Sequence, residues 1–164
     1  MNKENIEIIF KQAKKYYLET ENVSIKLKFT PLYYSTMTSR PKIILFLFPW
    51  LKRNYVISVN SSEKYKKFAI PLSILNDSIL LGWIGHELAH IIQYEKMGKK
   101  EIMSFPFKYG LNKKFRKNFE TEADEITKQR GLEKELKEGI NFVLTNTKIS
   151  TAYKNRLKKF YSQI

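Results

Sequence analysis

The first apolar residues of the chain recur with the period of an α-helix. Ile6, Ile9, Ala13 and Tyr17 fall close to a 3.6-residue repeat, and lysines and glutamates occupy many of the positions between them. This pattern predicts an amphipathic helix over residues 2–20.

After residue 22 the pattern changes to short apolar stretches. Four of them are rich in β-branched or aromatic residues and are separated by proline or charged pairs: 23–29, 32–38, 42–48 and 54–60. They predict a sheet of about four strands, mostly antiparallel. The third stretch is apolar along its length, as in a strand covered on both faces, so we expect it to be central.

The second half of the chain is predicted to be helical. Residues 61–75 form an irregular connector with a short helix ending near Pro71, and Asn76 is a suitable N-cap for a helix that runs to about Met97. Gly98 ends that helix.

Pro106 and Gly110 predict a long loop over residues 99–116. Three further helices follow, with a break at Gly131: about 117–130, 132–145 and 150–161. At 164 residues and 43% hydrophobic content, the chain suits one α+β domain over residues 1–164.

Composition restricts the chemistry that this domain can perform. The chain has no cysteine, which excludes disulfides and thiolate metal sites, so any zinc ion must be held by nitrogen and oxygen. It has 30 basic and 16 acidic residues, a net charge of +14. A field of this sign can attract nucleic acid, anionic membranes or acidic substrates, but lysines that solvate the surface are the favoured interpretation.

Two further features concern location. The most apolar run, residues 43–51, is far shorter than the roughly 20 residues that cross a bilayer, and Pro49 interrupts it. The first 21 residues lack the unbroken apolar core of a secretory signal. We therefore expect a cytoplasmic protein without a transmembrane segment.

Both histidines of the chain lie in one short stretch, GWIGHELAH. On a helix His90 lies about 40° around the axis from His86, and Glu87 about 100°, so two imidazoles point one way beside a carboxylate. A catalytic zinc site needs such a pair of nitrogen ligands and a nearby general base that is not itself a ligand. Gly82 and Gly85 leave room near this face for another segment of the chain to approach.

A third ligand must be a carboxylate, because no other histidine or cysteine exists. The stretch FETEADE, 119–125, is acidic and predicted to be helical. There Glu120 and Asp124 share one face, whereas Glu122 lies about 200° away from Glu120. We assign Glu120 as the third ligand, and we expect Asp124 to accept the free ring N–H of one histidine.

HELAH at 86–90 followed by ETEAD at 120–124 resembles the HExxH plus ExxxD pattern of gluzincin metallopeptidases. The motifs are most similar to the CAAX-prenyl-protease and heat-shock membrane-protease group and to its small soluble relatives, the minigluzincins. The resemblance implies a zincin-like fold with a twisted sheet above an active-site helix. It also implies zinc ligands at His86, His90 and Glu120, a catalytic Glu87, and Asp124 bonded to a ligand.

The chain also departs from these families. It lacks their transmembrane helices, so their lipidated substrates do not carry over, and it has no further histidine to polarise the scissile carbonyl. Tyr109, Arg116 and Tyr153 are the candidates for that electrophilic role. Proteases that cleave phage repressors also combine HExxH with a later Glu and stay a related alternative, whereas Spartan-like proteases use a third His.

The expected activity is zinc-dependent hydrolysis of a peptide or protein substrate. Zinc lowers the pKa of a bound water, and Glu87 takes its proton and passes it to the leaving amine. Zinc proteases of this architecture hold substrate against an edge strand, but the sequence leaves open which strand that is. The alternative is a catalytically silent or latent scaffold that binds a protein or nucleic-acid partner through its basic surface.

Overall fold

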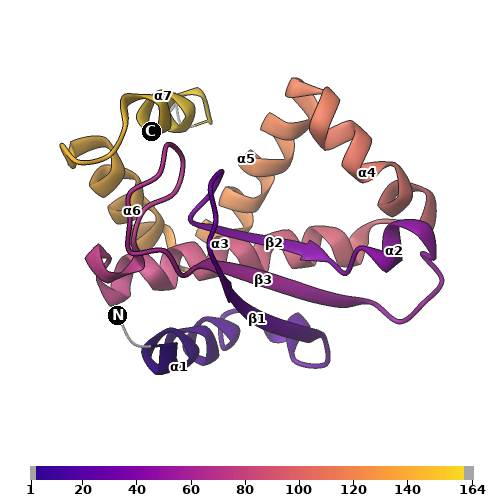
Figure 1. Cartoon of the computed structure of the whole chain (residues 1–164). Coiled ribbons are helices and arrows are strands. Elements are labelled where there is room, and N and C mark those ends of the chain that lie inside the picture. Colours follow the sequence, from indigo (N-terminus) through magenta and orange to yellow (C-terminus); the bar gives the residue numbers. More distant parts are fainter. Residues whose placement is uncertain (1–2, 161–164) are drawn as a thin grey trace.

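The structure is a computed structural model that describes residues 3–160 (Figure 1). Within these residues it is a mixed α+β fold, which confirms the predicted class in outline, with seven α-helices and a three-stranded sheet. The elements are α1 Lys3–Lys14, β1 Ser24–Thr30, β2 Met37–Pro41, α2 Ile44–Leu47, β3 Asn54–Asn60, α3 Asp77–Lys96, α4 Lys99–Leu111, α5 Lys113–Gln129, α6 Glu133–Thr145 and α7 Thr151–Phe160. Short 3-10 turns occupy Leu18–Thr20 and Leu72–Ile74.

The sheet is smaller than predicted and is not mostly antiparallel. Its order is β1-β3-β2: β1 pairs with β3 in parallel, and β2 pairs with β3 antiparallel. The chain passes from one side of β3 to the other between β1 and β2, whereas β2 and β3 are antiparallel neighbours joined by the segment that contains α2. The central strand is β3, whose Tyr55, Ile57 and Val59 are buried.

The predicted central strand at 42–48 was wrong, because this segment contains the short helix α2. Both edges of β3 are already taken by β1 and β2, so no position beside it remains. Leu45 is buried beneath the helix, whereas Ile43 and Leu47 are exposed. An unbroken apolar run therefore marked a surface segment instead of a covered strand.

The predicted strand at 32–38 overlaps β2 only at its end. The side chain of Asn60 bonds to the backbone of the segment that precedes β2. Its Oδ1 accepts a hydrogen bond from the Leu32 N–H at 3.0 Å. The Thr36 hydroxyl accepts from the Ile70 N–H at 3.2 Å. These bonds satisfy the connecting segment without a ladder.

Helix α3 lies at the centre of the molecule and packs against α1, α5, α6 and β2 (Figure 1). Its predicted start is confirmed, because the Asn76 side chain accepts from the Ile79 N–H at 2.8 Å. At the other end the Arg53 guanidinium donates to the carbonyls of Tyr94 at 2.6 Å and Met97 at 2.5 Å. Both helix ends are thus satisfied by side chains.

The predicted loop at 99–116 was wrong, because α4 occupies most of it. Pro106 lies within this helix and removes one backbone donor. Packing compensates: the Phe105 ring lies 4.9 Å from that of Phe119 and 5.0 Å from that of Tyr94. The tertiary contacts of an aromatic cluster thus outweigh the local proline signal.

The remaining helices follow the predictions with shifted ends. α5 begins earlier than expected, where the Asn112 side chain accepts from the Phe115 N–H at 2.9 Å. Gly131 breaks the chain with a φ of 84°, as predicted. Asn2 and Tyr161, the outer ends of two predicted helices, lie outside the described residues. In the described part, no helix is long and apolar enough to cross a membrane.

Candidate metal centre

Helices α3 and α5 bring His86, His90 and Glu120 together. The Glu120 Oε2 atom lies 3.4 Å from His86 Nε2 and 3.5 Å from His90 Nε2. One ligand atom from each residue lies within 4.8 Å of the others, so this group could hold a metal ion. The histidines come from adjacent turns of α3 and the carboxylate from a segment 30 residues later.

Hydrogen bonds on the far side of each imidazole determine which nitrogen carries the proton. His86 Nδ1 lies 2.8 Å from Asp124 Oδ1, and His90 Nδ1 lies 2.8 Å from Gln93 Oε1. A carboxylate and an amide oxygen accept, so each Nδ1 donates, and in the neutral form of each ring the Nε2 lone pair then faces Glu120. This is the tautomer that a metal ligand needs.

Gln93 is oriented by α5. Its Nε2 donates to the Phe119 carbonyl and to Glu122 Oε2, each at 2.9 Å. Because both partners accept, the amide oxygen of Gln93 must face His90. The His90 ring also stacks on Phe119, with centroids 4.8 Å apart and an interplanar angle of 12°. Two independent contacts thus fix the second imidazole.

The acidic groups dominate the electrostatics of the site. Burial lowers the pKa of His86, but the carboxylates of Asp124 and Glu120 outweigh it and raise the pKa well above the usual value. Burial raises the pKa of Glu120, and the two imidazoles outweigh that effect and hold the pKa well below its usual range. The position between these groups therefore favours positive charge.

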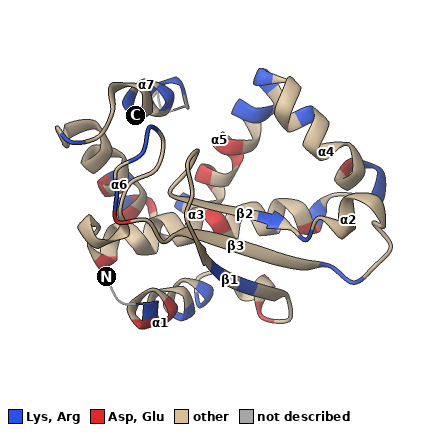
Figure 2. Cartoon of the chain, in the orientation of Figure 1, with Lys and Arg blue, Asp and Glu red and all other residues tan. Residues whose placement is uncertain are grey.

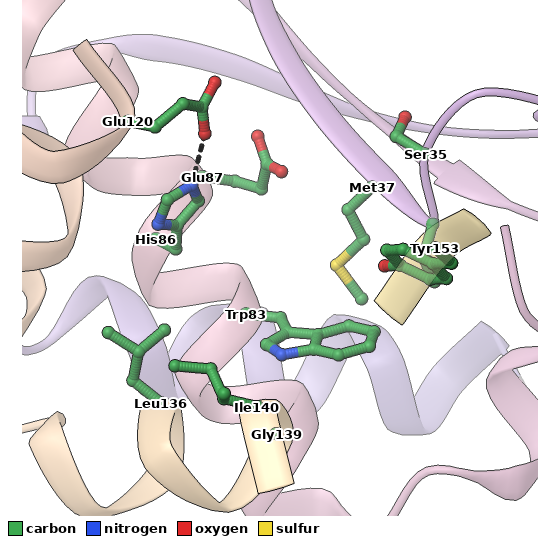
Figure 3. Close-up of a pocket in the computed structure, with 11 residues that line it drawn as sticks. Ser35, Met37, Trp83, His86, Glu87, Glu120, Leu136, Gly139, Ile140 and Tyr153 are labelled. Atoms are coloured by element: carbon green, nitrogen blue, oxygen red, sulfur yellow. Dashed lines mark ion pairs between the residues drawn. The ribbon is translucent and has the colours of Figure 1, made fainter. Parts of the chain in front are cut away.

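Glu87 differs from the other polar groups of the site. It is buried, and its Oε2 has no hydrogen-bond partner among the described residues. A buried carboxylate oxygen without a partner is costly, so this oxygen is available to a group from outside the chain. Ser39 Oγ and Glu135 Oε2 are the other buried side-chain atoms in the described residues that lack a partner. Figure 3 shows the Glu87 side chain projecting between Glu120 and Met37 into a pocket.

Two pockets meet at the candidate centre, and His86, Glu87 and Glu120 line both. The narrower encloses about 140 Å³ and extends toward Trp83 and Tyr153 (Figure 3). The wider encloses about 370 Å³. It is also lined by residues of β2, α2, α4 and α7, among them Ser39, Phe46, Pro106 and Arg156.

Strand β2 is the sheet edge that borders these pockets. Thr36 accepts from the Asn60 N–H, and the Lys42 N–H donates to Asn54, so the even-numbered residues bond to β3. In an antiparallel pair the alternate residues direct their backbone groups the other way. Met37 and Ser39, which line the wider pocket, therefore direct N–H and C=O groups away from β3.

The three candidate electrophiles occupy different places. Tyr109 lines the wider pocket, and its hydroxyl donates to Glu120 Oε1 at 2.5 Å. Tyr153 lines the narrower pocket beside Glu87, and burial raises the pKa of its hydroxyl, which keeps it protonated. Arg116 stacks over the Tyr109 ring at 5.7 Å and lines neither pocket. The structure thus brings two of the three to the cleft.

Sequence reasoning missed Gln93, Glu122 and Arg156. Gln93 had a weak signal, a polar residue one turn after His90 on an otherwise apolar helix. Helix geometry places Glu122 on a different face from Glu120, but its long side chain reaches Gln93. Arg156 comes from α7 and donates to the Tyr34 carbonyl at 2.6 Å. No local sequence pattern predicts that Arg156 lies at the wider pocket.

The two glycines of α3 allow close approach by other segments, as expected. A Cβ on Gly82 would lie 2.6 Å from a backbone atom of Glu135, and one on Gly85 would lie 2.6 Å from the Leu132 side chain. The segment that leads into α6 and its first turn thus pack tightly beneath the ligand-bearing turns. This packing holds α3 rigidly under the site.

A scan against protein-family models and searches of curated proteins and of solved structures found no match. The gluzincin resemblance therefore rests on its two motifs and on the arrangement of the residues that they contain.

Proposed function

We propose that this protein is a zinc-dependent peptidase of the gluzincin type. The observation that carries the proposal is the convergence of three lone-pair atoms, from His86, His90 and Glu120, beside the partnerless carboxylate oxygen of Glu87. Two nitrogens and one oxygen match the donor set of catalytic zinc sites, which keep one position open.

Two of the three distances between the donors also fit zinc. Bonds of about 2.0 to 2.1 Å in a tetrahedron place neighbouring ligand atoms about 3.3 to 3.4 Å apart. The two separations from Glu120 Oε2, 3.4 and 3.5 Å, are close to this value. Calcium and magnesium prefer oxygen ligands, so two imidazoles disfavour them.

In this proposal each residue has a separate task. A zinc ion bound here would act as a Lewis acid and lower the pKa of water in the cleft. Glu87 takes the proton of the attacking water and delivers it to the leaving nitrogen. Tyr153 donates a hydrogen bond to the carbonyl oxygen as charge develops on it, since the Tyr109 hydroxyl is already bonded to Glu120.

The edge strand supports a peptide as substrate. The N–H and C=O groups of Met37 and Ser39 that point away from β3 can pair with an extended chain laid along β2. The two pockets would then accept side chains on either side of the scissile bond.

Metal analysis and peptide digestion together test the proposal. We expect the purified protein to contain zinc and to cleave members of a peptide library. The Glu87→Gln variant should bind zinc with wild-type affinity and lose at least about 100-fold in kcat/KM, the lower range for a general base. If both proteins hold zinc and neither cleaves, a zinc-stabilised scaffold that binds a partner replaces the peptidase. If neither protein holds metal, the proposal that His86, His90 and Glu120 bind a metal ion is wrong.

A further inference from the structure

The segment around α2 exposes large apolar side chains. Trp50 is 63% exposed and Leu47 is 65% exposed, and the neighbouring Phe48 packs edge-on against Trp50 with centroids 5.4 Å apart. Most apolar residues of this size are buried in folded proteins. The exposed members of the segment are Ile43, Ile44, Leu47, Phe48, Trp50 and Leu51.

Helix α4 exposes a second apolar stripe. Met103, Phe107 and Leu111 lie on successive turns, and Phe107 and Leu111 are 71% and 84% exposed. Ile102 and Phe105, on the other side of the helix, are buried. α4 is thus apolar on its packed side and also on its solvent side, where an ordinary surface helix would be polar.

The two stripes belong to one region, because α2 and α4 are in contact and lie at the same end of the molecule (Figure 1). We call the six residues of the α2 segment together with Met103, Phe107 and Leu111 the apolar surface. A cluster of nine exposed apolar side chains is unusual on a protein that functions without a partner there.

Basic residues outnumber acidic residues along the segments that carry the apolar surface (Figure 2). Residues 40–53 contain four basic and no acidic residues, and residues 96–117 contain eight basic residues and one acidic residue. Lys42, Lys52 and Lys100 are exposed, and in the described residues none of them forms an ion pair. Their charge thus faces outward beside the apolar side chains.

We propose that the apolar surface docks onto the face of an anionic lipid bilayer. Exposed Trp, Phe and Leu side chains can enter the boundary between headgroups and acyl chains, while the flanking lysines bind anionic headgroups. A second copy of the chain would bring two sets of lysines together at the same interface. The charge therefore favours a negatively charged apolar partner, and an anionic bilayer has both properties.

Docking in this way would place the cleft close to the bilayer. Phe46 of α2 and Pro106 of α4 line the wider pocket, so the helices that carry the apolar surface also border the candidate centre. The docking itself does not depend on metal or on hydrolysis. The Glu87→Gln variant should therefore bind vesicles as the wild type does.

Vesicle co-sedimentation tests the proposal. Wild-type protein should bind vesicles of equimolar phosphatidylcholine and phosphatidylglycerol, and should bind pure phosphatidylcholine vesicles at least about tenfold more weakly, because each lysine near an anionic surface contributes about 1 kcal/mol. Binding to the anionic vesicles should shift the Trp50 fluorescence to shorter wavelength. Equal binding to both vesicles, or to neither, would overturn the proposal.

Matched variants assign the binding to this surface. The triple variant Trp50→Ser, Phe107→Ser, Leu111→Ser should bind at least about tenfold more weakly, since each buried side chain contributes about 1.5 kcal/mol or more. The control Ile8→Ser, Leu18→Ser, Tyr33→Ser removes three exposed side chains elsewhere and should bind normally. Lys42→Glu with Lys52→Glu should weaken binding more than Lys11→Glu with Lys134→Glu.

Two results would assign the apolar surface to something else. If the triple variant and its control lose binding equally, the attraction is general and not local. If light scattering shows a dimer that the triple Ser variant disperses, and no vesicle binding occurs, the occupant is a second copy of the chain. Circular dichroism on every variant distinguishes lost binding from lost folding.

Discussion

The candidate metal centre and the apolar surface both depart from the usual distribution of side chains, in which polar groups are exposed and apolar groups are buried. At the junction of α3 and α5, Glu87, His90 and Asp124 are buried, and His86 and Glu120 are partly buried beside them. On α2 and α4, nine large apolar side chains face outward. Burying a polar group without a partner costs free energy, and so does exposing a large apolar side chain to water. A ligand or partner from outside the chain can remove either cost.

The two regions differ in how many of their groups are satisfied by contacts within the protein. Around the centre, Asp124, Gln93 and Glu122 orient the imidazoles, while Glu87 keeps a buried oxygen that has no partner among the described residues. The helices that carry the apolar surface contact each other, and α4 also contacts α5, but the side chains of the apolar surface themselves are exposed. A preorganised polar centre suits a small ion held in fixed geometry, whereas a loosely bordered apolar surface suits a fluid partner.

Two neighbouring aromatic residues of α4 provide the sharpest test of this comparison. Phe105 is buried in the aromatic cluster, and Phe107 lies on the apolar surface. Phe105→Ala should lower the free energy of unfolding by about 3 to 5 kcal/mol, because it leaves a cavity. Phe107→Ala should change it by less than about 0.5 kcal/mol. Urea unfolding measures both, and equal losses would mean that α4 packs differently.

Removing the carboxylate of the centre should have the next largest effect. Glu120→Gln should weaken zinc binding by more than about 100-fold, which is the upper range for residues that only orient a ligand. Glu125→Gln, on the exposed side of the same helix, should bind zinc normally. Competition with a chromogenic chelator measures both affinities. Wild-type affinity in Glu120→Gln would remove it from the ligand set.

Gln93 tests whether orientation matters as the structure indicates. Gln93→Leu removes the acceptor of the His90 Nδ1 proton, so zinc affinity should fall by about 10- to 100-fold. Gln129→Leu, an exposed change on α5, serves as the control. The imidazole signals of His90 in NMR spectra should show mixed tautomers in Gln93→Leu only. Unchanged affinity and tautomer would show that Phe119 stacking suffices.

Tyr17 should give a smaller effect than the residues of the centre, because its buried hydroxyl is satisfied within the protein by Thr127 at 3.3 Å. Tyr17→Phe should cost about 1 kcal/mol at neutral pH. Burial raises the pKa of Tyr17 to about 12, so the unfolded chain ionises first above its usual pKa of 10.0. Stability therefore falls from pH 10 toward pH 12, and Tyr17→Phe should show a shallower fall in thermal unfolding. An identical slope would contradict this.

The sequence predicts those residues of the candidate centre that lie on the same face of one helix. His86 and His90 are four residues apart, as are Glu120 and Asp124, so each pair is aligned by one turn of its own helix. The same reasoning predicts that Asp124 bonds one of the two histidines, and the structure shows that it is His86. Gln93, Glu122 and Arg156 did not, because their contacts depend on side-chain reach and on which helices meet.

The sequence by itself determined the start of α3 at Asn76, the break at Gly131 and strand β3, because capping, positive φ and β-branched composition act within a few residues. Only the tertiary structure decided that residues 42–48 contain a surface helix, that α4 forms despite Pro106, and that β2 is the edge beside the cleft. Each of these depends on which other segments of the chain pack into the core. Apolar composition alone therefore does not determine whether a segment is buried there or exposed to solvent.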